Sequence, residues 1–201
     1  HVPWMKRHQA MIKEADLPGV VERFNQAENA AAHLIAAGYV RIGIDHFALS
    51  HDTLAEAAEA GRVQRNFQGY TVDPADALIG LGASSIGSLP QGYVQNVAAI
   101  AEYQRQAKAE GFATARGIEL SREDAARAHV IERLMCDLVF SKREIVERFG
   151  AVAEPILLDA AEVAGSDRDG FIETTPDGFR VNERGRPFLR AIAARFDTYL
   201  A

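Results

Sequence analysis

Two serine-led helix starts followed by a hairpin pattern constrain the second half of this 201-residue chain. Ser121-Arg122-Glu123-Asp124 and Ser141-Lys142-Arg143-Glu144 resemble capping boxes, in which a hydroxyl and an acid three residues later satisfy free N–H groups at a helix start. They predict helices over about 122–138 and 142–149. A third helix near 154–164, a hairpin over 171–181 and a last helix over about 183–200 complete a winged-helix outline.

The first half alternates between helical and strand-like patterns. Helices are predicted over 18–37, 52–60 and 96–110, and strands over 39–44 and 76–82. A helix followed by a strand is the order of a parallel α/β unit. We therefore expect α/β organisation in residues 1–116, and a change of pattern near Arg116-Gly117 predicts a second, helical domain over 117–201.

Composition argues against several function classes. No run approaches the roughly 18 apolar residues that a membrane span needs, so we expect a cytoplasmic protein with no membrane partner. The net charge is −6, and the predicted helix 154–164 carries three acids and no Lys or Arg, which argues against nucleic-acid binding. A single cysteine, Cys136, can form no internal disulfide and cannot hold a cysteine-ligated cluster or zinc by itself.

Two neighbouring segments are the strongest candidates for a ligand site. Arg65-Asn66-Phe67-Gln68-Gly69-Tyr70-Thr71 combines an aromatic, an amide and a glycine, and the small-residue run 80–87 follows it. Glycines let the backbone approach a ligand and Phe offers a flat apolar face, although the glycines of the second run are also explained by tight packing. That run is a poor dinucleotide fingerprint because its third glycine is misplaced.

Two other candidates, the Asp45-His46 pair and Cys136, favour structural explanations. Asp45-His46 could do acid–base chemistry, but adjacent strand residues point to opposite faces, so the two side chains are not expected to meet. Cys136 lies on a largely apolar predicted helix and is expected in the core. No histidine has a partner at metal-ligand spacing, so no metal site is predicted.

Several motifs along the whole chain resemble the oxygen-independent coproporphyrinogen III oxidases, a radical S-adenosylmethionine (SAM) family. The motifs are Gly43-Ile44-Asp45-His46-Phe47-Ala48, Leu54-Ala55, Gly61, Arg65-Asn66-Phe67-Gln68-Gly69-Tyr70-Thr71, Leu81-Gly82-Ala83-Ser84-Ser85-Ile86, Tyr93-x-Gln95-Asn96, Arg116-Gly117 and Phe196-Asp197-x-Tyr199-Leu200. The chain resembles only the C-terminal part of such an enzyme. The resemblance implies the end of a partial (β/α) radical SAM barrel followed by a helical winged-helix-like domain.

The resemblance also implies an activity and its cofactors. Family members use SAM and a 4Fe-4S cluster held by a Cys-x-x-x-Cys-x-x-Cys motif to convert two propionates of coproporphyrinogen III to vinyl groups, which gives protoporphyrinogen IX in haem biosynthesis. With one cysteine, this chain is expected to be inactive alone, to need the missing N-terminal part of the enzyme as partner, and to have its catalytic residues upstream. The electron acceptor stays open.

Three residues match family positions that bind a second SAM: Ile86, which ranks first, Phe67 and Gln68. Departures from the family pattern lie beside them, at Gln64, Val72 and the loop Leu89-Pro90-Gln91. Two alternatives remain: a winged-helix module that docks a protein partner, and a radical SAM relative that handles another tetrapyrrole.

Overall fold

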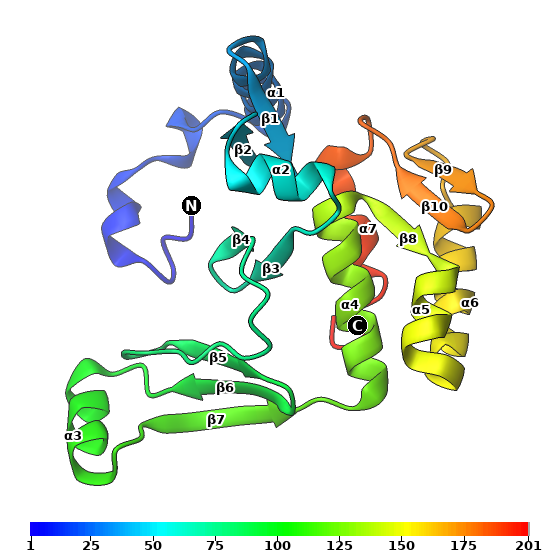
Figure 1. Cartoon of the computed structure of the whole chain (residues 1–201). Coiled ribbons are helices and arrows are strands. Elements are labelled where there is room, and N and C mark those ends of the chain that lie inside the picture. The colour runs from blue at the N-terminus through cyan, green and yellow to red at the C-terminus, as the bar shows by residue number, and fades with distance from the viewer. Residues whose placement is uncertain (201) are drawn as a thin grey trace.

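A long helix, α4 (Arg122–Asp137), stands between the two halves of the computed structural model, which describes residues 1–200 (Figure 1). The predicted capping box at its start is confirmed: the Asp124 N–H donates to the Ser121 hydroxyl at 3.1 Å, and the Ser121 N–H donates to the Asp124 carboxylate at 2.9 Å. The helix ends at Leu138, whose φ of 61° is left-handed. This conformation turns the chain directly into the next strand.

The predicted winged-helix outline forms around α4. Its elements are β8 (Val139–Ser141), α5 (Lys142–Phe149), α6 (Ala153–Gly165), β9 (Ile172–Thr175) and β10 (Gly178–Val181). The strands form an antiparallel sheet in the order β8-β10-β9. Phe140 stacks between Phe179 and Phe196, with ring centroids 5.3 and 5.9 Å apart, and all three are buried. These rings form the centre of the larger core.

The last predicted helix, over 183–200, is wrong in extent. The structure has a short 3-10 helix, η4 (Arg186–Phe188), and then α7 (Leu189–Ala194). The Asn182 side chain accepts the N–H of Gly185 and forms a turn where the helix was expected to begin. After α7, the Asp197 carboxylate accepts the N–H of Tyr199 at 2.9 Å, so the chain end also forms local turns.

In the first half, antiparallel hairpins replace the parallel unit that was expected. After the short helices η1 (Arg7–Met11) and η2 (Glu14–Asp16), the elements are α1 (Val20–Ala36), β1 (Tyr39–Ile42), β2 (His46–Leu49), α2 (Thr53–Glu59), β3 (Gln64–Asn66) and β4 (Gly69–Thr71). β1 pairs antiparallel with β2, and β3 with β4. The connections are too short for a crossover, since parallel strands need about a dozen linking residues or more.

A three-stranded antiparallel sheet comes next, made of β5 (Ile86–Leu89), β6 (Gly92–Asn96) and β7 (Thr114–Glu119) in that order. Helix α3 (Ile100–Glu110) joins β6 to β7 and lies at one end of the sheet (Figure 1). The strand predicted over 76–82 is wrong, because only Leu78 forms a bridge, to Ser88. Helix α3 starts at Ile100 rather than at 96, because Asn96 belongs to β6 and its side chain donates to the carbonyls of Gly80 and Gly82.

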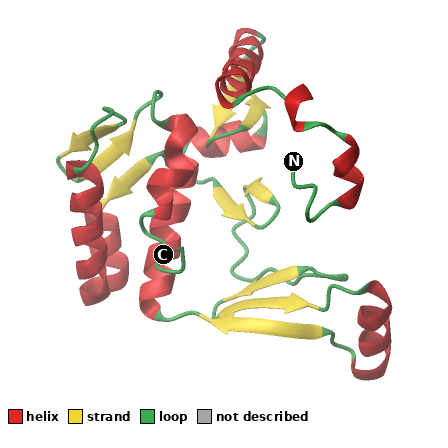
Figure 2. Ribbon diagram, turned by 180° about the vertical axis from the view of Figure 1, so that it is seen from behind, coloured by secondary structure: helices red, strands yellow, loops and turns green. Residues whose placement is uncertain are grey.

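Seen from behind, the sheet β5–β7 lies apart from the helical half and is joined to the start of α4 by a short loop (Figure 2). Residues 1–200 contain helices and antiparallel sheets and no closed barrel. The predicted boundary at Arg116-Gly117 falls inside β7, and Cys136 of α4 packs in the small core of the first half with Ile42 and Val63. The two-domain division therefore remains a prediction. Over the same residues, no helix has both the length and the apolar character of a membrane span.

Candidate functional site

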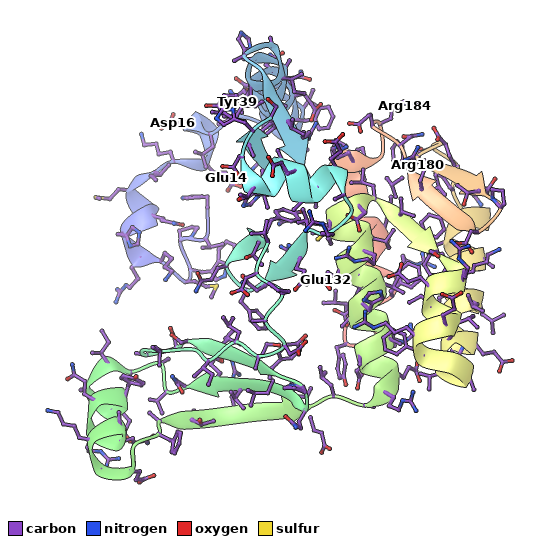
Figure 3. All side chains as sticks on the ribbon, in the orientation of Figure 1. Glu14, Asp16, Tyr39, Glu132, Arg180 and Arg184 are labelled. Carbon is purple, nitrogen blue, oxygen red and sulfur yellow. The ribbon has the colours of Figure 1, made fainter. Side chains whose placement is uncertain are left out.

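A cavity of about 540 Å³ lies where the β3–β4 hairpin, the sheet β5–β7, α4 and the C-terminal segment meet. Glu132 extends from α4 on the side that faces β3 (Figure 3). The residues that line the cavity come from four segments: Arg65, Asn66, Phe67, Thr71, Asp73 and 75–79; Ser88, Tyr93, Ile118 and Leu120; Asp124, Arg127, Ala128, Ile131, Glu132 and Met135; and 196–199. Its volume is within the usual range for small-molecule pockets.

The β3–β4 hairpin is attached firmly to α4. The backbone N–H of Arg65 donates to Oε1 of Glu132 at 2.9 Å. The Tyr70 hydroxyl accepts the N–H of Ile44 at 3.1 Å and donates to the carbonyl of Met135 at 2.9 Å. Burial raises the pKa of Tyr70, so the hydroxyl keeps the proton that it donates. The hairpin therefore holds a fixed place at the cavity wall.

Gly43 allows the Tyr70 hydroxyl to reach its partners. This glycine has a φ of +55°, and a Cβ there would overlap the Tyr70 phenol. Only a residue without a side chain satisfies both the left-handed backbone and the close approach of the ring. The Gly43 that begins the family motif is thus explained by the packing of Tyr70.

Phe67 is the predicted site residue that lines the cavity. It lies in the turn between β3 and β4, where the Asn66 side chain accepts the N–H groups of Gln68 and Gly69 at 2.8 and 3.3 Å. Its ring packs edge-to-face on Tyr93 of β6, with centroids 5.2 Å apart, yet remains 53% exposed. A half-exposed aromatic ring supported from one side offers its free face to a ligand.

Ile86 lies on the same sheet face as part of the cavity wall but does not border the cavity. Strand residues two apart share a face, and Ile86 is two residues from Ser88 on β5. Its cross-strand partner is Gln95, whose side-chain oxygen accepts two N–H groups of Arg116 at 2.6 and 2.8 Å. The face that begins at the cavity thus continues past Ser88 to Ile86.

Gln68 lies beside Phe67 in the exposed turn and is not part of the cavity lining. The structure therefore brings Phe67 to the cavity, places Ile86 farther along the same sheet face, and leaves Gln68 at the hairpin tip. Whether these three residues bind SAM stays a prediction.

The C-terminal motif forms a wall of the cavity that the sequence analysis did not include among the site residues. Arg127, only 8% exposed, donates to Glu123 at 2.8 Å, to Asp159 at 2.7 Å and to the carbonyl of Phe196 at 3.3 Å. Through these bonds the buried Arg127 holds the chain end against α4, where Asp197 and Tyr199 line the cavity. The motif Phe196-Asp197-x-Tyr199-Leu200 was the available signal, but its contact with Arg127, 69 positions earlier, leaves no local pattern in the sequence.

The Asp45 and His46 side chains do meet, contrary to the expectation. Asp45 belongs to the turn between β1 and β2, so strand alternation does not separate it from His46, and its Oδ1 lies 3.0 Å from Nδ1 of His46. Arg190 also reaches Asp45 at 3.3 Å. The cavity lining does not include either residue.

The described residues do not fit an iron–sulfur cluster. Cys136 is buried as predicted, and burial raises the pKa of its thiol to about 12, which disfavours the thiolate that a cluster requires. No group of three or more His, Cys, Asp or Glu side chains within residues 1–200 could hold a metal ion.

Comparisons with known proteins agree with the motifs. No family model matches the chain. It is 43% identical over 200 residues to an oxygen-independent coproporphyrinogen III oxidase of Bradyrhizobium diazoefficiens, 42% over 199 residues to one of Cereibacter sphaeroides, and 35% over 201 residues to one of Salmonella typhimurium. These matches cover 99 to 100% of the chain, which spans 44% of the length of each relative.

A solved structure gives the same result. The coproporphyrinogen III oxidase of Escherichia coli, described as a radical SAM enzyme, superimposes with a TM-score of 0.91 and 34% identity over 99% of this chain and 46% of that one. This likeness confirms the predicted fold class as a mixed helix and sheet part of such an enzyme. From end to end, the chain is thus homologous to a part of the oxygen-independent coproporphyrinogen III oxidases, as its motifs predict.

Proposed function

We propose that this chain forms one part of an enzyme that oxidatively decarboxylates coproporphyrinogen III to protoporphyrinogen IX in the cytoplasm. The observation that carries the proposal is the convergence of distant motifs. Arg65 to Thr71, Tyr93 and Asp197 to Tyr199 were recognised separately along the chain, and members of all three border one cavity. Motifs that share a cavity but not a stretch of sequence are typical of a ligand site.

The proposed reaction is the same at each of two propionates. The side chain loses carbon dioxide and one hydride equivalent and becomes a vinyl group; a hydrogen atom would pass to SAM, as the oxidant, and the remaining electron to an external one-electron acceptor. Because the single buried thiol of this chain cannot ligate a cluster, we place the cluster ligands and the catalytic residues in the remainder of the enzyme. The contribution of this chain is to bind and orient ligands.

Within that contribution, we assign Phe67, Gln68 and Ile86 to the binding of SAM. The free face of Phe67 can stack on adenine or contact the sulfonium, and Gln68 has both a donor and acceptors in an exposed turn. Ile86 adds apolar surface on the sheet face that leads away from the cavity. The three residues would then border a ligand from one side.

A chimera tests the function. This chain replaces the matching 200 residues of the Bradyrhizobium relative, and the purified chimera is assayed under anaerobic conditions for conversion of coproporphyrinogen III. We expect protoporphyrinogen IX to form. A chimera that cleaves SAM but leaves this substrate unchanged would contradict the assignment, and turnover of another tetrapyrrole would favour the alternative relative.

Variants of the chimera test the proposed SAM contacts. Ile86→Ala and Phe67→Ala should each weaken SAM binding in equilibrium dialysis, whereas Phe112→Ala, which removes an 80% exposed ring outside the cavity lining, should leave it unchanged. Gln68→Ala is expected to weaken binding less, because it loses one polar contact at the hairpin tip. Unchanged binding in a variant removes that residue from the site.

A further inference from the structure

The cavity contains one arginine whose charge is not used by the surrounding protein. Arg65 and Arg127 are the cations of its lining. Arg127 is neutralised by Glu123 and Asp159. The guanidinium of Arg65, by contrast, makes no hydrogen bond and no ion pair within residues 1–200; only its backbone N–H is bonded, to Glu132. An unpaired guanidinium at a cavity wall is available for an anionic group of a ligand.

The exposed Arg65 side chain rests on an aromatic ring. Arg65 and Tyr70 are cross-strand partners in the β3–β4 hairpin, and the guanidinium carbon lies 5.7 Å from the centroid of the Tyr70 ring. Tyr70 is in turn held by Ile44 and Met135 through its hydroxyl. A cation held over an immobilised ring loses little conformational freedom when it binds a ligand.

The acidic side chains of the cavity make positions away from Arg65 unfavourable for an anionic group of a ligand. Five carboxylates line the cavity: Asp124 accepts the N–H of Ser121, Asp197 that of Tyr199, Glu132 that of Arg65 and Asp73 that of Ala75, and Asp76 is the fifth. They repel a carboxylate ligand from the α4 side, from the C-terminal side and from the segment 73–76, so the guanidinium of Arg65 is the favourable place for a carboxylate. The remaining wall is largely apolar, with contributions from Leu78, Ile79, Tyr93, Ile118, Ile131, Met135 and Phe196.

We propose that Arg65 binds a carboxylate of the ligand that occupies this cavity. The inference rests on the proposed function, in which two ligands bear a carboxylate: the porphyrinogen through its propionates and SAM through its amino-acid end. The planar guanidinium matches a carboxylate with two parallel hydrogen bonds. The apolar wall suits the body of a large, flat ligand.

Ligand binding to the full 201-residue chain tests the inference. The probes are coproporphyrin III, the oxidised and fluorescent form of the proposed substrate; its tetramethyl ester, which lacks the carboxylates; and SAM. Arg65→Gln removes the charge, and Arg65→Lys keeps the charge without the forked geometry. Arg23→Gln removes one exposed positive charge from α1 and serves as the matched control. Urea unfolding of each variant checks that the fold is retained.

Arg65→Gln should weaken binding of coproporphyrin III or of SAM by about 10- to 100-fold, the cost of a lost charge-assisted pair. The probe that loses affinity identifies the source of the carboxylate. Binding of the ester should not change, Arg65→Lys should recover part of the affinity, and Arg23→Gln should have no effect. Equal losses for acid and ester, unchanged binding of both acids, or no binding of either acid by the unaltered chain would overturn the inference.

The chimera separates failure of this inference from failure of the proposed function. An active chimera with the same KM for coproporphyrinogen III and the same affinity for SAM after Arg65→Gln keeps the function and overturns the role of Arg65. An inactive chimera, together with carboxylate-dependent binding to the chain that Arg65→Gln weakens, rejects the function and supports the carboxylate site.

Discussion

The winged-helix region, residues 122–200, and the sheet region, residues 72–121, bury their apolar residues to very different degrees. In the first, sixteen buried side chains form one core that includes Phe140, Leu134 and Ile156. In the second, every residue of β7 is exposed, as are Leu81 and Phe112. Local stability depends on buried apolar area, so the two regions should differ in their resistance to unfolding.

The largest expected difference in the free energy of unfolding is between a variant that truncates a buried ring and one that truncates an exposed ring. Phe140→Ala should lower the free energy of unfolding by about 3–5 kcal/mol, because it leaves a cavity between two stacked rings. Phe112→Ala should change it by no more than about 0.5 kcal/mol. Urea unfolding followed by circular dichroism measures both, and similar values for the two variants would remove the contrast.

Tyr70→Phe tests the contact that attaches the β3–β4 hairpin to α4. The substitution leaves the N–H of Ile44 and the carbonyl of Met135 without their partner, which should cost about 1–3 kcal/mol. Amide hydrogen exchange should speed up at Ile44 and in the β3–β4 hairpin while the winged-helix core keeps its protection. An equal increase of exchange in all elements would show that the hydroxyl stabilises the whole fold rather than the attachment of the hairpin to α4.

The thiol of Cys136 predicts a loss of stability at alkaline pH. Its pKa is raised from 9.0 to about 12 in the folded chain, so the unfolded chain ionises first as the pH rises. Ionisation of the unfolded chain should therefore lower the free energy of unfolding by about 1 kcal/mol between pH 8 and pH 10. Cys136→Ala should remove this part of the pH slope; an unchanged slope would assign the loss to other groups.

The smallest effect is expected at the start of α4. Ser121→Ala removes one half of the capping box and should destabilise the chain by roughly 0.5–1 kcal/mol. Ser121→Asp should restore most of this, since aspartate also caps. Thermal unfolding resolves the difference, and a Ser121→Ala variant as stable as the parent would mean that Asp124 alone satisfies the helix end.

The same contrast explains what could be predicted from sequence. The starts of α4 and α5 and the β9–β10 hairpin were predictable because capping residues and turn glycines act within a few residues. The strand expected at 76–82 failed because Asn96, far along the chain, bonds to the carbonyls of Gly80 and Gly82. The antiparallel pairing of β1 with β2 was missed because the turn at Gly43 interrupts an apparently continuous strand pattern.

The candidate site was only partly predictable. Phe67 was found from the composition of its loop and again through the resemblance, and the structure places it at the cavity. The contributions of Arg127 and Tyr199 were not found, because they depend on the bonds by which the buried Arg127 joins α4, α6 and the chain end. Such a network follows from tertiary packing and leaves no periodic trace in the sequence.

The attachment of the hairpin to α4 determines which elements of the molecule move as one rigid unit. Because Glu132 and Met135 hold the hairpin while the opposite side of α4 packs in the winged-helix core, these elements form a single mechanical body. The sheet β5–β7 is joined to that body by the segments 72–85 and 119–121, so any movement of the sheet against the body would bend the chain there. The same movement would separate Phe67 from Tyr93, whose edge-to-face contact links the hairpin to the sheet.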